Sequence, residues 1–333
     1  MMGRAFFRLG NYEPLLELAS GGMATVYLAR QLGAAGFERL VVIKRVHPHL
    51  LGNREFYDMF RDEARVASLI RHQNVVPVTN VAESDGELFL VMEYIESVSL
   101  GTLVKATNTA DTLVPPRIIV RIVCDVLAGL HAAHEGVDMM GAPLHVVHRD
   151  VSPQNIIVGT DGSSRIIDFG IAQAADRLSD TKTGSLKGKL AYMAPEQAIG
   201  RPADKRVDVF SCGVTLHEAL TGKRLFRGEN DIETLKRIVD HPIPDPSSIV
   251  PDLPWPLDAV VQRALARNPD ERFPTAAAFQ EALETAMPPA SPREVATFLK
   301  SKVGDRLSER HQRLRAILDG SAPSLAAQSE AAH

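Results

Sequence analysis

The chain has 333 residues, of which 45% are hydrophobic, which is enough apolar material for one large or two smaller globular domains. A formal net charge of −4 and a pI near 6.3 exclude the overall basic field of a nucleic-acid-binding protein. The sequence has neither an apolar run of the length a membrane span needs nor a signal-peptide core. It therefore predicts a cytoplasmic, soluble chain with no membrane span and no nucleic-acid partner.

The cysteines and histidines give no signal for a metal site or a disulfide. Cys124 and Cys212 lie inside apolar patterns of helical spacing and are interpreted as small buried hydrophobes, which favours a reducing compartment. His131 and His134 share one helix face, but no carboxylate or thiol at metal-ligand spacing accompanies them.

The first part of the chain is predicted to be mainly strand, with one helix. Strand patterns cover Leu18–Leu28 (interrupted by a glycine turn), Leu40–Val46 and Leu88–Met92, and helical periodicity covers Glu55–Leu69. From Leu100 onward helices dominate. They are predicted over Pro116–His134, Val207–Leu220, Ile232–Val239, Leu257–Ala266 and Thr275–Ala286. This order indicates a small β-rich lobe followed by a larger helical lobe.

A last helix is predicted after the Pro288-Pro289 break. Ser291 is a good N-cap, with proline at the first helical position and Glu294 three residues after the cap. The apolar stripe of this helix either packs on its own lobe or binds a regulatory partner or a second copy through residues 291–318. The Ala/Ser-rich residues 321–333 are predicted to be disordered.

The most informative motif is the segment from His148 to Asn155, which precedes Asp168-Phe169-Gly170. An aspartate, an asparagine five residues later and a second aspartate opening a Phe-Gly turn form the polar core of a kinase active site. One carboxylate accepts the proton of a substrate hydroxyl. The amide and the second carboxylate hold Mg²⁺ on the phosphates of ATP.

A glycine turn and a lysine upstream add to this pattern. Gly21 and Gly22 are small enough for backbone amides to approach a phosphate, although an ordinary hairpin has the same composition. Lys44 follows the apolar run Val41–Ile43, where a charge needs partners. Glu63 in the following helix and ATP phosphates are the predicted partners; the alternative is a pair of unrelated surface charges.

With these landmarks in order, the chain resembles the eukaryotic-like (Hanks-type) serine/threonine protein kinases of bacteria, from about Leu15 to Ala286. The resemblance implies an α+β, two-lobed protein kinase fold with ATP in the cleft. It places the kinase domain at residues 12–287, with an N-lobe at 12–92, a hinge at 93–97 and a C-lobe at 98–287. A helical extension at 288–320 follows.

The resemblance also implies roles for individual residues. Asp150 would be the catalytic base, Lys44 and Glu63 an ion pair on the phosphates, and Asn155 and Asp168 the Mg²⁺ ligands. The residues implied to contact ATP, besides Lys44, are Leu18, Ala19, Ser20, Gly21, Gly22, Val26, Val42, Met92 (the gatekeeper), Glu93, Ile95 and Ile157. Ala19 and Ala24 stand where the family usually has glycine.

Three further landmarks of the family are implied. Glu196 and Arg272 resemble the buried ion pair that anchors the end of the activation segment. Asp208 resembles the aspartate that holds the catalytic-loop backbone. Arg149 resembles the arginine that pairs with a phosphorylated activation-loop residue, for which Thr181 and Thr183 are the candidates.

One position departs from the family pattern. Ser152 stands where serine/threonine kinases usually carry a lysine, and Lys189 stands where they usually carry a threonine. Our hypothesis is a swap in which Lys189 reaches the transferring phosphate and Ser152 supplies the hydroxyl. The alternative is that Lys189 is solvated and catalysis is crippled.

The sequence therefore predicts a signalling enzyme, a non-specific serine/threonine protein kinase that transfers the γ-phosphate of ATP to proteins and autophosphorylates its activation loop. The alternative is a pseudokinase that acts as a nucleotide-binding scaffold. Lys44, Glu63, Asp150, Asn155 and Asp168 favour activity.

Overall fold

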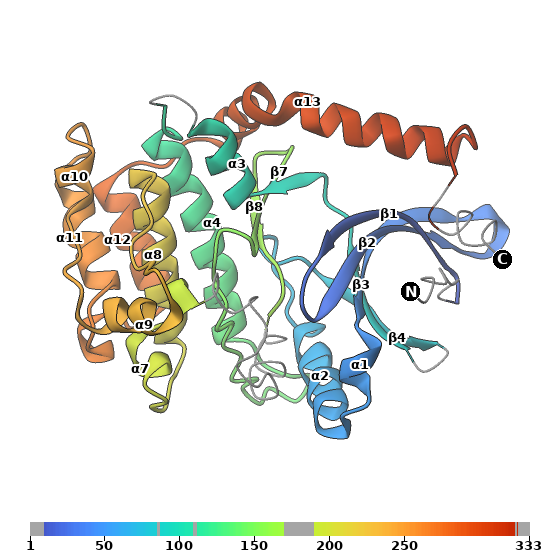
Figure 1. The fold of residues 1–333 in the computed structure, drawn as a ribbon, viewed down its shortest axis with the longest axis horizontal. Helices are drawn as coiled ribbons and strands as arrows, with labels where there is room; N and C mark the ends of the chain where they lie inside the picture. Colours follow the sequence, from blue (N-terminus) through green and yellow to red (C-terminus); the bar gives the residue numbers. More distant parts are fainter. Residues whose placement is uncertain (1–9, 85–86, 109–111, 170–189, 324, 326–333) are drawn as a thin grey trace. The chain divides into compact units, whose positions relative to one another are not determined.

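The computed structural model describes residues 10–84, 87–108, 112–169, 190–323 and 325 (Figure 1). Two compact units make up the chain. Unit 1 contains the residues up to Ser68, the segment Pro77–Ile95 and the residues from Gly304 on; unit 2 contains Leu69–Val76 and Glu96–Val303. The predicted order, a small strand-rich part before a larger helical part, is confirmed.

Unit 1 is built on a five-stranded antiparallel sheet with the order β1-β2-β3-β5-β4. The strands are β1 (Tyr12–Ser20), β2 (Ala24–Leu32), β3 (Glu38–Val46), β4 (Val78–Ser84) and β5 (Glu87–Glu93). The pairs β1–β2, β2–β3 and β4–β5 join strands that are consecutive in sequence, so their register is set locally. Only the pair β3–β5 of this sheet joins strands that are not consecutive. Alternating buried positions in β3, such as Val41 and Ile43, give the sheet an apolar face.

Two helices follow β3 in unit 1, α1 (Pro48–Leu51) and α2 (Arg54–Ala67). The Asn53 side chain accepts a hydrogen bond from the Phe56 amide at 3.1 Å and so caps α2. Phe56, Phe60, Ala64 and Ala67, spaced at three or four residues, are buried on one face of the helix. This amphipathic pattern explains why the helix predicted over Glu55–Leu69 is found within two residues of its expected bounds.

Unit 2 contains a small sheet and most of the helices. The sheet has the order β6-β7-β8, with β6 (Ser97–Ser99), β7 (Ile156–Gly159) and β8 (Ser164–Ile166). The helices are α3 (Leu100–Thr107), α4 (Pro116–His134), α7 (Pro195–Ala198), α8 (Arg206–Thr221), α9 (Asp231–Asp240), α10 (Pro246–Ile249), α11 (Pro256–Ala264) and α12 (Ala276–Ala286).

Helix α8 forms the centre of unit 2. All its residues from Val207 to Thr221 are buried, as expected for a helix surrounded by others. It packs against α4, α11 and α12, which Figure 1 shows around it. Gly222 ends the helix in the left-handed conformation with φ of 68°. A buried central helix can hold polar groups in fixed positions, and Asp208 does so below.

Residues 69–76, which the sequence division places in the N-lobe, belong to unit 2. The Asn74 side-chain amide donates to the carbonyl of Ser164 at 2.8 Å, and the Val76 amide donates to the carbonyl of Ile166 at 3.1 Å. These long-range hydrogen bonds tie the segment to β8. Local sequence patterns cannot predict these hydrogen bonds, because the bonded residues are far apart in the chain.

The last helix, α13 (Pro292–Leu318), begins at the predicted cap. The Ser291 amide donates to the Glu294 carboxylate at 2.7 Å, and the Glu294 amide donates back to the Ser291 hydroxyl at 3.3 Å. Val295 and Leu299 are buried, and Leu314 is buried in a cluster with Leu15, Leu16 and Leu28. The burial of these side chains favours packing on the protein's own units over the partner-binding alternative.

A tight approach fixes the start of α13. Gly162, in the turn between β7 and β8, has φ of +81°, and a Cβ placed on it would lie 1.8 Å from the carbonyl oxygen of Pro292. Only glycine satisfies both the left-handed backbone and the missing space.

Among the residues that the structure describes, no helix is both long enough and apolar enough to cross a bilayer.

Candidate active site

The catalytic-loop backbone is anchored by one buried carboxylate. Asp208 of α8 is completely buried, and it accepts hydrogen bonds from the backbone amides of His148 at 2.8 Å and Arg149 at 2.7 Å. His134 of α4 donates its Nε2 proton to the same carboxylate at 2.7 Å. The predicted contact between Asp208 and the catalytic loop is therefore confirmed. The part played by His134 was not predicted, because it depends on how two helices pack.

The hydrogen-bond partners of Asp208 determine the direction in which its pKa is shifted. Burial alone would raise the pKa of Asp208, but the hydrogen bond and charge of His134, with the donors from the loop, hold that pKa below its ordinary value. The carboxylate is thus ionised and fully hydrogen-bonded. Arg149 has φ of 65°, a left-handed conformation that costs energy in a non-glycine residue. The amide hydrogen bonds to Asp208 offset that cost.

Asn155 positions the predicted base. Its side-chain amide donates to the Asp150 backbone carbonyl at 2.8 Å and to the Asp150 carboxylate at 3.0 Å. The backbone amide of Asn155 donates to the backbone carbonyl of Ser152 at 2.9 Å, which closes the loop. Because the side-chain nitrogen of Asn155 faces Asp150, its Oδ1 is left as an acceptor for a ligand.

Hydrogen bonds of the neighbouring Ile167 backbone hold Asp168 beside the catalytic loop. The Ile167 amide donates to the Asn155 carbonyl at 3.0 Å, and His148 Nε2 donates to the Ile167 carbonyl at 2.8 Å. The ring of Phe169 packs edge-on against that of His148, with the centroids 4.7 Å apart. Asp168 has φ of 67°. A strained conformation held by surrounding contacts is typical of a functional position.

The residues present fit a magnesium ion. Asp168 and Asn155 offer a carboxylate and an amide oxygen, the hard donors that Mg²⁺ prefers, and both belong to unit 2. Over the part of the chain that is described, no three His, Cys, Asp or Glu side chains gather as a metal cluster. Mg²⁺ commonly takes only one or two protein ligands and completes its shell with water and phosphate oxygens. The donor set therefore suits a nucleotide-bound magnesium.

A second buried ion pair lies farther along unit 2. Arg272 donates through both terminal nitrogens to the two oxygens of Glu196, each at 2.7 Å. Its remaining protons go to the carbonyls of Ala266, Arg206 and Arg267. The guanidinium is buried and all five of its N–H groups are used, as burial of an arginine requires. The predicted pair is confirmed.

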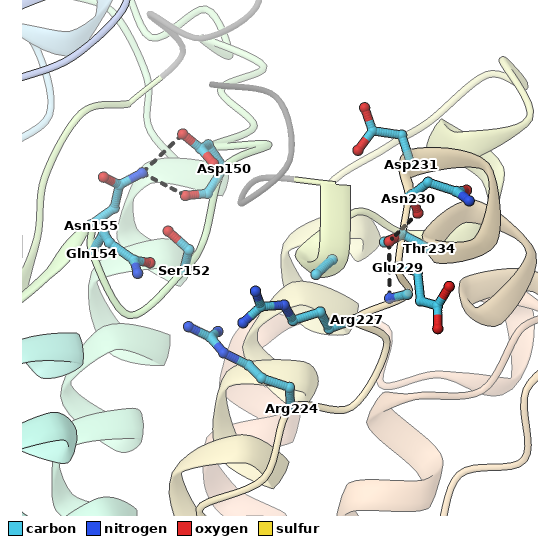
Figure 2. Close-up of a pocket in the computed structure, with 12 residues that line it drawn as sticks. Asp150, Ser152, Gln154, Asn155, Arg224, Arg227, Glu229, Asn230, Asp231 and Thr234 are labelled. Atoms are coloured by element: carbon cyan, nitrogen blue, oxygen red, sulfur yellow. Dashed lines mark hydrogen bonds between the residues drawn. The ribbon is translucent and has the colours of Figure 1, made fainter. Parts of the chain in front are cut away.

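A pocket of about 460 Å³ opens beside the catalytic loop, entirely within unit 2. One wall is the catalytic loop; the other is the segment between α8 and α9 together with the first turns of α9 (Figure 2). Its lining residues are Asp150, Ser152, Gln154, Asn155, Ala191, Arg224, Arg227, Gly228, Glu229, Asn230, Asp231 and Thr234. A cavity next to the predicted base is where a substrate hydroxyl would arrive.

Ser152 belongs to this pocket. Its side chain is nearly buried, and its hydroxyl makes no hydrogen bond to any residue that the structure describes. Lys189, its predicted counterpart in the swap, lies outside the described residues, as do Thr181 and Thr183.

Arg224 and Arg227, which the sequence did not single out, are the main cations of the pocket. Arg224 contacts the Glu218 carboxylate at 2.8 Å and the Tyr192 hydroxyl, and Tyr192 donates to the same carboxylate at 2.7 Å. Burial lowers the pKa of Arg224, but the charges and hydrogen bonds of Glu218 and Tyr192 together outweigh it and raise that pKa overall. Two arginines within four residues were the available sequence signal.

The predicted nucleotide-contacting residues of unit 1 gather on one part of its sheet. Pairing places Val26 opposite Lys44 and Val42 opposite Met92, so these four side chains share one face. Ala19 and Ser20 end β1, and Gly21 lies in the turn, its amide donating to the Ala24 carbonyl at 3.0 Å. The other members in this unit are Leu18, Gly22, Glu93 and Ile95.

Lys44 is buried in β3, beside Val26 and Leu90. Glu63 lies on α2 of the same unit, on its third turn. A buried ammonium is costly unless opposite charge or hydrogen bonds compensate it. Ile157, the remaining predicted nucleotide contact, lies on β7 in unit 2, between Ser99 and Arg165 in register.

Comparison with known proteins identifies the family. Residues 12–284 match the family described as "Protein kinase domain", so the chain belongs to the protein kinase family. The solved kinase domain of PknI from Mycobacterium tuberculosis has a TM-score of 0.64 and 25% identity, covering 86% of this chain and 100% of that one. The fold is thus the protein kinase fold that was predicted.

The relatives are bacterial protein kinases with two kinds of name. The chain is 43% identical over 306 residues to the tyrosine-protein kinase MasK of Myxococcus xanthus, covering 90% of this chain and 47% of MasK. It is 34% identical to the serine/threonine-protein kinase Pkn1 of Myxococcus xanthus, over 84% of this chain and 39% of Pkn1. It is 35% identical to the serine/threonine-protein kinase PknB of Mycobacterium leprae, over 85% of this chain and 44% of PknB. The chain spans less than half the length of these relatives.

Proposed function

We propose that this chain is an active kinase that uses Mg-ATP to phosphorylate serine and threonine hydroxyls of proteins. The observation that carries the proposal is the hydrogen bond of 3.0 Å from Asn155 to the Asp150 carboxylate. It aims an ionisable base into a pocket while the oxygen of the same asparagine remains for a metal ion. A scaffold that only binds nucleotide has no need of this geometry.

The chemistry follows from the positions of these groups. The substrate hydroxyl hydrogen-bonds to Asp150, and its oxygen forms a bond to the γ-phosphorus while the bond from that phosphorus to the β,γ-bridging oxygen breaks. ADP leaves with the bridging oxygen, and the hydroxyl proton passes to Asp150. Asn155 and Asp168 would hold Mg²⁺, whose positive charge would offset the charge of the transferring group. Lys44 is proposed to hold the other phosphates, paired with Glu63.

The experiment that tests activity compares the wild type with Asp168→Asn in Mg-ATP. An active kinase incorporates phosphate into a protein substrate, and Asp168→Asn lowers turnover by about 10²–10³-fold or more, since a group that positions charge is removed. Equal and negligible turnover by both proteins, with retained nucleotide binding, would establish the pseudokinase alternative.

The acceptor residue needs its own measurement, because one relative is named a tyrosine kinase and several are named serine/threonine kinases. We propose serine and threonine as acceptors. Phosphoamino-acid analysis of products made with mixed peptides containing Ser, Thr or Tyr decides the question. Phosphotyrosine as the main product would replace this part of the proposal and leave the transfer reaction intact.

Autophosphorylation of Thr181 or Thr183 is also proposed. Arg149 next to the base makes no ion pair with any residue in the described ranges, so its guanidinium is available to a phosphate. Incubation with ATP followed by mass spectrometry should place phosphate between residues 179 and 185. Asp150→Asn is the control that should remain unmodified. Absence of phosphate in the active wild type would contradict this step.

The swap of Ser152 and Lys189 remains a proposal of the same kind. Ser152 contributes a buried hydroxyl to the pocket wall, which leaves the usual lysine charge to be supplied from elsewhere. Lys189→Ala should lower turnover by about 10²–10³-fold, the usual cost of removing one positioned charge donor. Lys300→Ala, on the exposed face of α13, is the matched control. Full turnover by Lys189→Ala would remove the hypothesis.

A further inference from the structure

The pocket beside Asp150 has an uneven charge distribution. Its catalytic-loop wall offers, apart from Asp150, only the uncharged side chains of Ser152, Gln154 and Asn155. Across from them, Arg224 and Arg227 point their guanidinium groups toward Ser152 and Gln154 (Figure 2). A group bound between the two walls therefore meets two cations.

Arg227 has donors to spare. Its side chain is exposed in the pocket, and it makes no hydrogen bond or ion pair with any of the residues that are described. A guanidinium presents five N–H groups in a planar fork that matches a carboxylate. An arginine that lines a pocket with all of these groups unused is suited to take its partner from a ligand.

Arg224 is held in place by groups behind it. One terminal nitrogen contacts both the Glu218 carboxylate and the Tyr192 hydroxyl. Glu218 also accepts a hydrogen bond from the Leu225 amide at 2.9 Å and is itself buried, so it fixes the backbone that carries both arginines. The side chain of Arg224 remains 48% exposed, which leaves its other N–H groups for a second partner.

Apart from Asp150, the acidic side chains of the pocket are Glu229 and Asp231, which lie at or just before the start of α9. Figure 2 shows the Glu229 carboxylate pointing away from Arg224 and Arg227, with Asp231 on the next turn. Neither forms an ion pair with the arginines. The pocket is thus cationic on the side nearest Ser152 and acidic on the α9 side.

From this arrangement we infer that the site selects substrates with an aspartate or glutamate close to the accepting hydroxyl. The carboxylate is bound by Arg227 and by the free side of Arg224, while the hydroxyl meets Asp150. Because Asp150 repels a second carboxylate at its own position, the acidic residue flanks the acceptor along the peptide. The inference rests on the proposed function, since it names the substrate class of the same site.

The test uses the full chain and peptides that differ only in the flanking residues. One series carries glutamate, moved one position at a time along the peptide; the matched series carry glutamine and lysine. We expect kcat/KM for the best glutamate peptide to exceed that of its glutamine counterpart by about tenfold or more, the scale of one charge-assisted pair. The difference should appear mainly in KM.

Arg227→Glu reverses the charge without touching the anchored residues. It should reverse the order of preference, so that kcat/KM for the lysine peptide exceeds that for the glutamate peptide. Arg201→Glu, an exposed arginine of unit 2 that does not line the pocket, is the control and should keep the wild-type preference. A uniform loss on all three peptides with Arg227→Glu, or a wild type indifferent to charge, would overturn the inference.

Binding of a fluorescent glutamate peptide to the same proteins separates this inference from the proposed function. If no peptide is phosphorylated but the glutamate peptide binds and Arg227→Glu abolishes binding, the recognition stands and the kinase proposal fails. If the peptides are phosphorylated without any charge preference, the kinase proposal stands and the recognition fails. If the glutamate peptide neither binds nor reacts preferentially, the recognition is wrong in either case.

Discussion

The two walls of the pocket are built in opposite ways. In the catalytic loop the backbone is hydrogen-bonded to Asp208 and the base to Asn155. The facing segment is held by Glu218 and by hydrogen bonds to the first turns of α9, and it presents the exposed charges of Arg224 and Arg227 at its front. On one wall the base is fixed by a hydrogen bond from Asn155; on the other the arginines are exposed.

This difference separates two tasks. A reaction needs its groups held within fractions of an ångström, which buried and fully hydrogen-bonded contacts provide. Selection among substrates needs charges that are unpaired until the substrate arrives. Changes on the catalytic wall should therefore lower stability and turnover together, whereas changes on the facing wall should alter which substrate is used.

The largest effect is expected from Asp208→Ala. It leaves three donors, from His134, His148 and Arg149, buried without their acceptor. Losing one partner of such a buried network costs about 3–5 kcal/mol, and turnover should fall with the displaced loop. Urea unfolding of the full chain measures the first effect. Asp252→Ala, an exposed carboxylate, is the control and should stay close to wild type.

Next in size is Glu196→Gln, which tests a buried charge that belongs to neither wall. The Arg272 guanidinium would keep its three carbonyl acceptors and lose its counter-charge. We expect a loss of about 3 kcal/mol in the free energy of unfolding, at the lower end for a broken buried pair. Glu281→Gln, an exposed glutamate of α12, is the control. A loss no larger than that of the control would show that the pair contributes little.

A third effect concerns pH. The pKa of Asp208 is lower in the folded protein than its ordinary value, so its stabilisation is complete above the unfolded pKa of about 3.9 and is lost as pH falls through the folded pKa. The gap in unfolding free energy between wild type and Asp208→Asn should therefore narrow as pH is lowered from about 5 toward 2. A gap that stays constant across this range would contradict the assignment.

The smallest effect is expected from Tyr192→Phe. It removes the hydroxyl that donates to Glu218 and contacts Arg224, which should cost about 1 kcal/mol of stability. The preference for acidic peptides should weaken slightly, because Arg224 loses one of its supports while Arg227 is untouched. The ratio of kcat/KM for the glutamate and glutamine peptides measures this. A complete loss of preference would show that Arg224, rather than Arg227, carries the selectivity.

Much of the helical structure could be predicted because it is determined by local signals. Helix α4 begins at Pro116 and ends at His134 as expected, and α13 begins at the Ser291 cap. These signals act within one turn of a helix, where proline and capping side chains decide the boundary. The short elements α1, α7 and α10, with four residues each, have too little periodicity to be recognised.

The site could be predicted only where its residues follow a fixed spacing. Asp150, Asn155 and Asp168 are close in sequence, so their motif was visible. The contact of His134 with Asp208 and the convergence of Arg224 and Arg227 on the catalytic loop depend on packing between distant segments. No local pattern predicts such contacts, so the place of the two arginines beside the catalytic loop is known only from the structure.

The contact between Gly162 and the Pro292 carbonyl means that the turn obeys two restrictions of different origin. The backbone angle is a property of the turn itself, and asparagine can adopt it. The missing space belongs to α13, and no side chain fits there. In a chain shortened to end before Ser291, Gly162→Asn should be tolerated, whereas in the full chain it should displace the start of α13. The tail thus narrows the set of amino acids that a distant hairpin can accept.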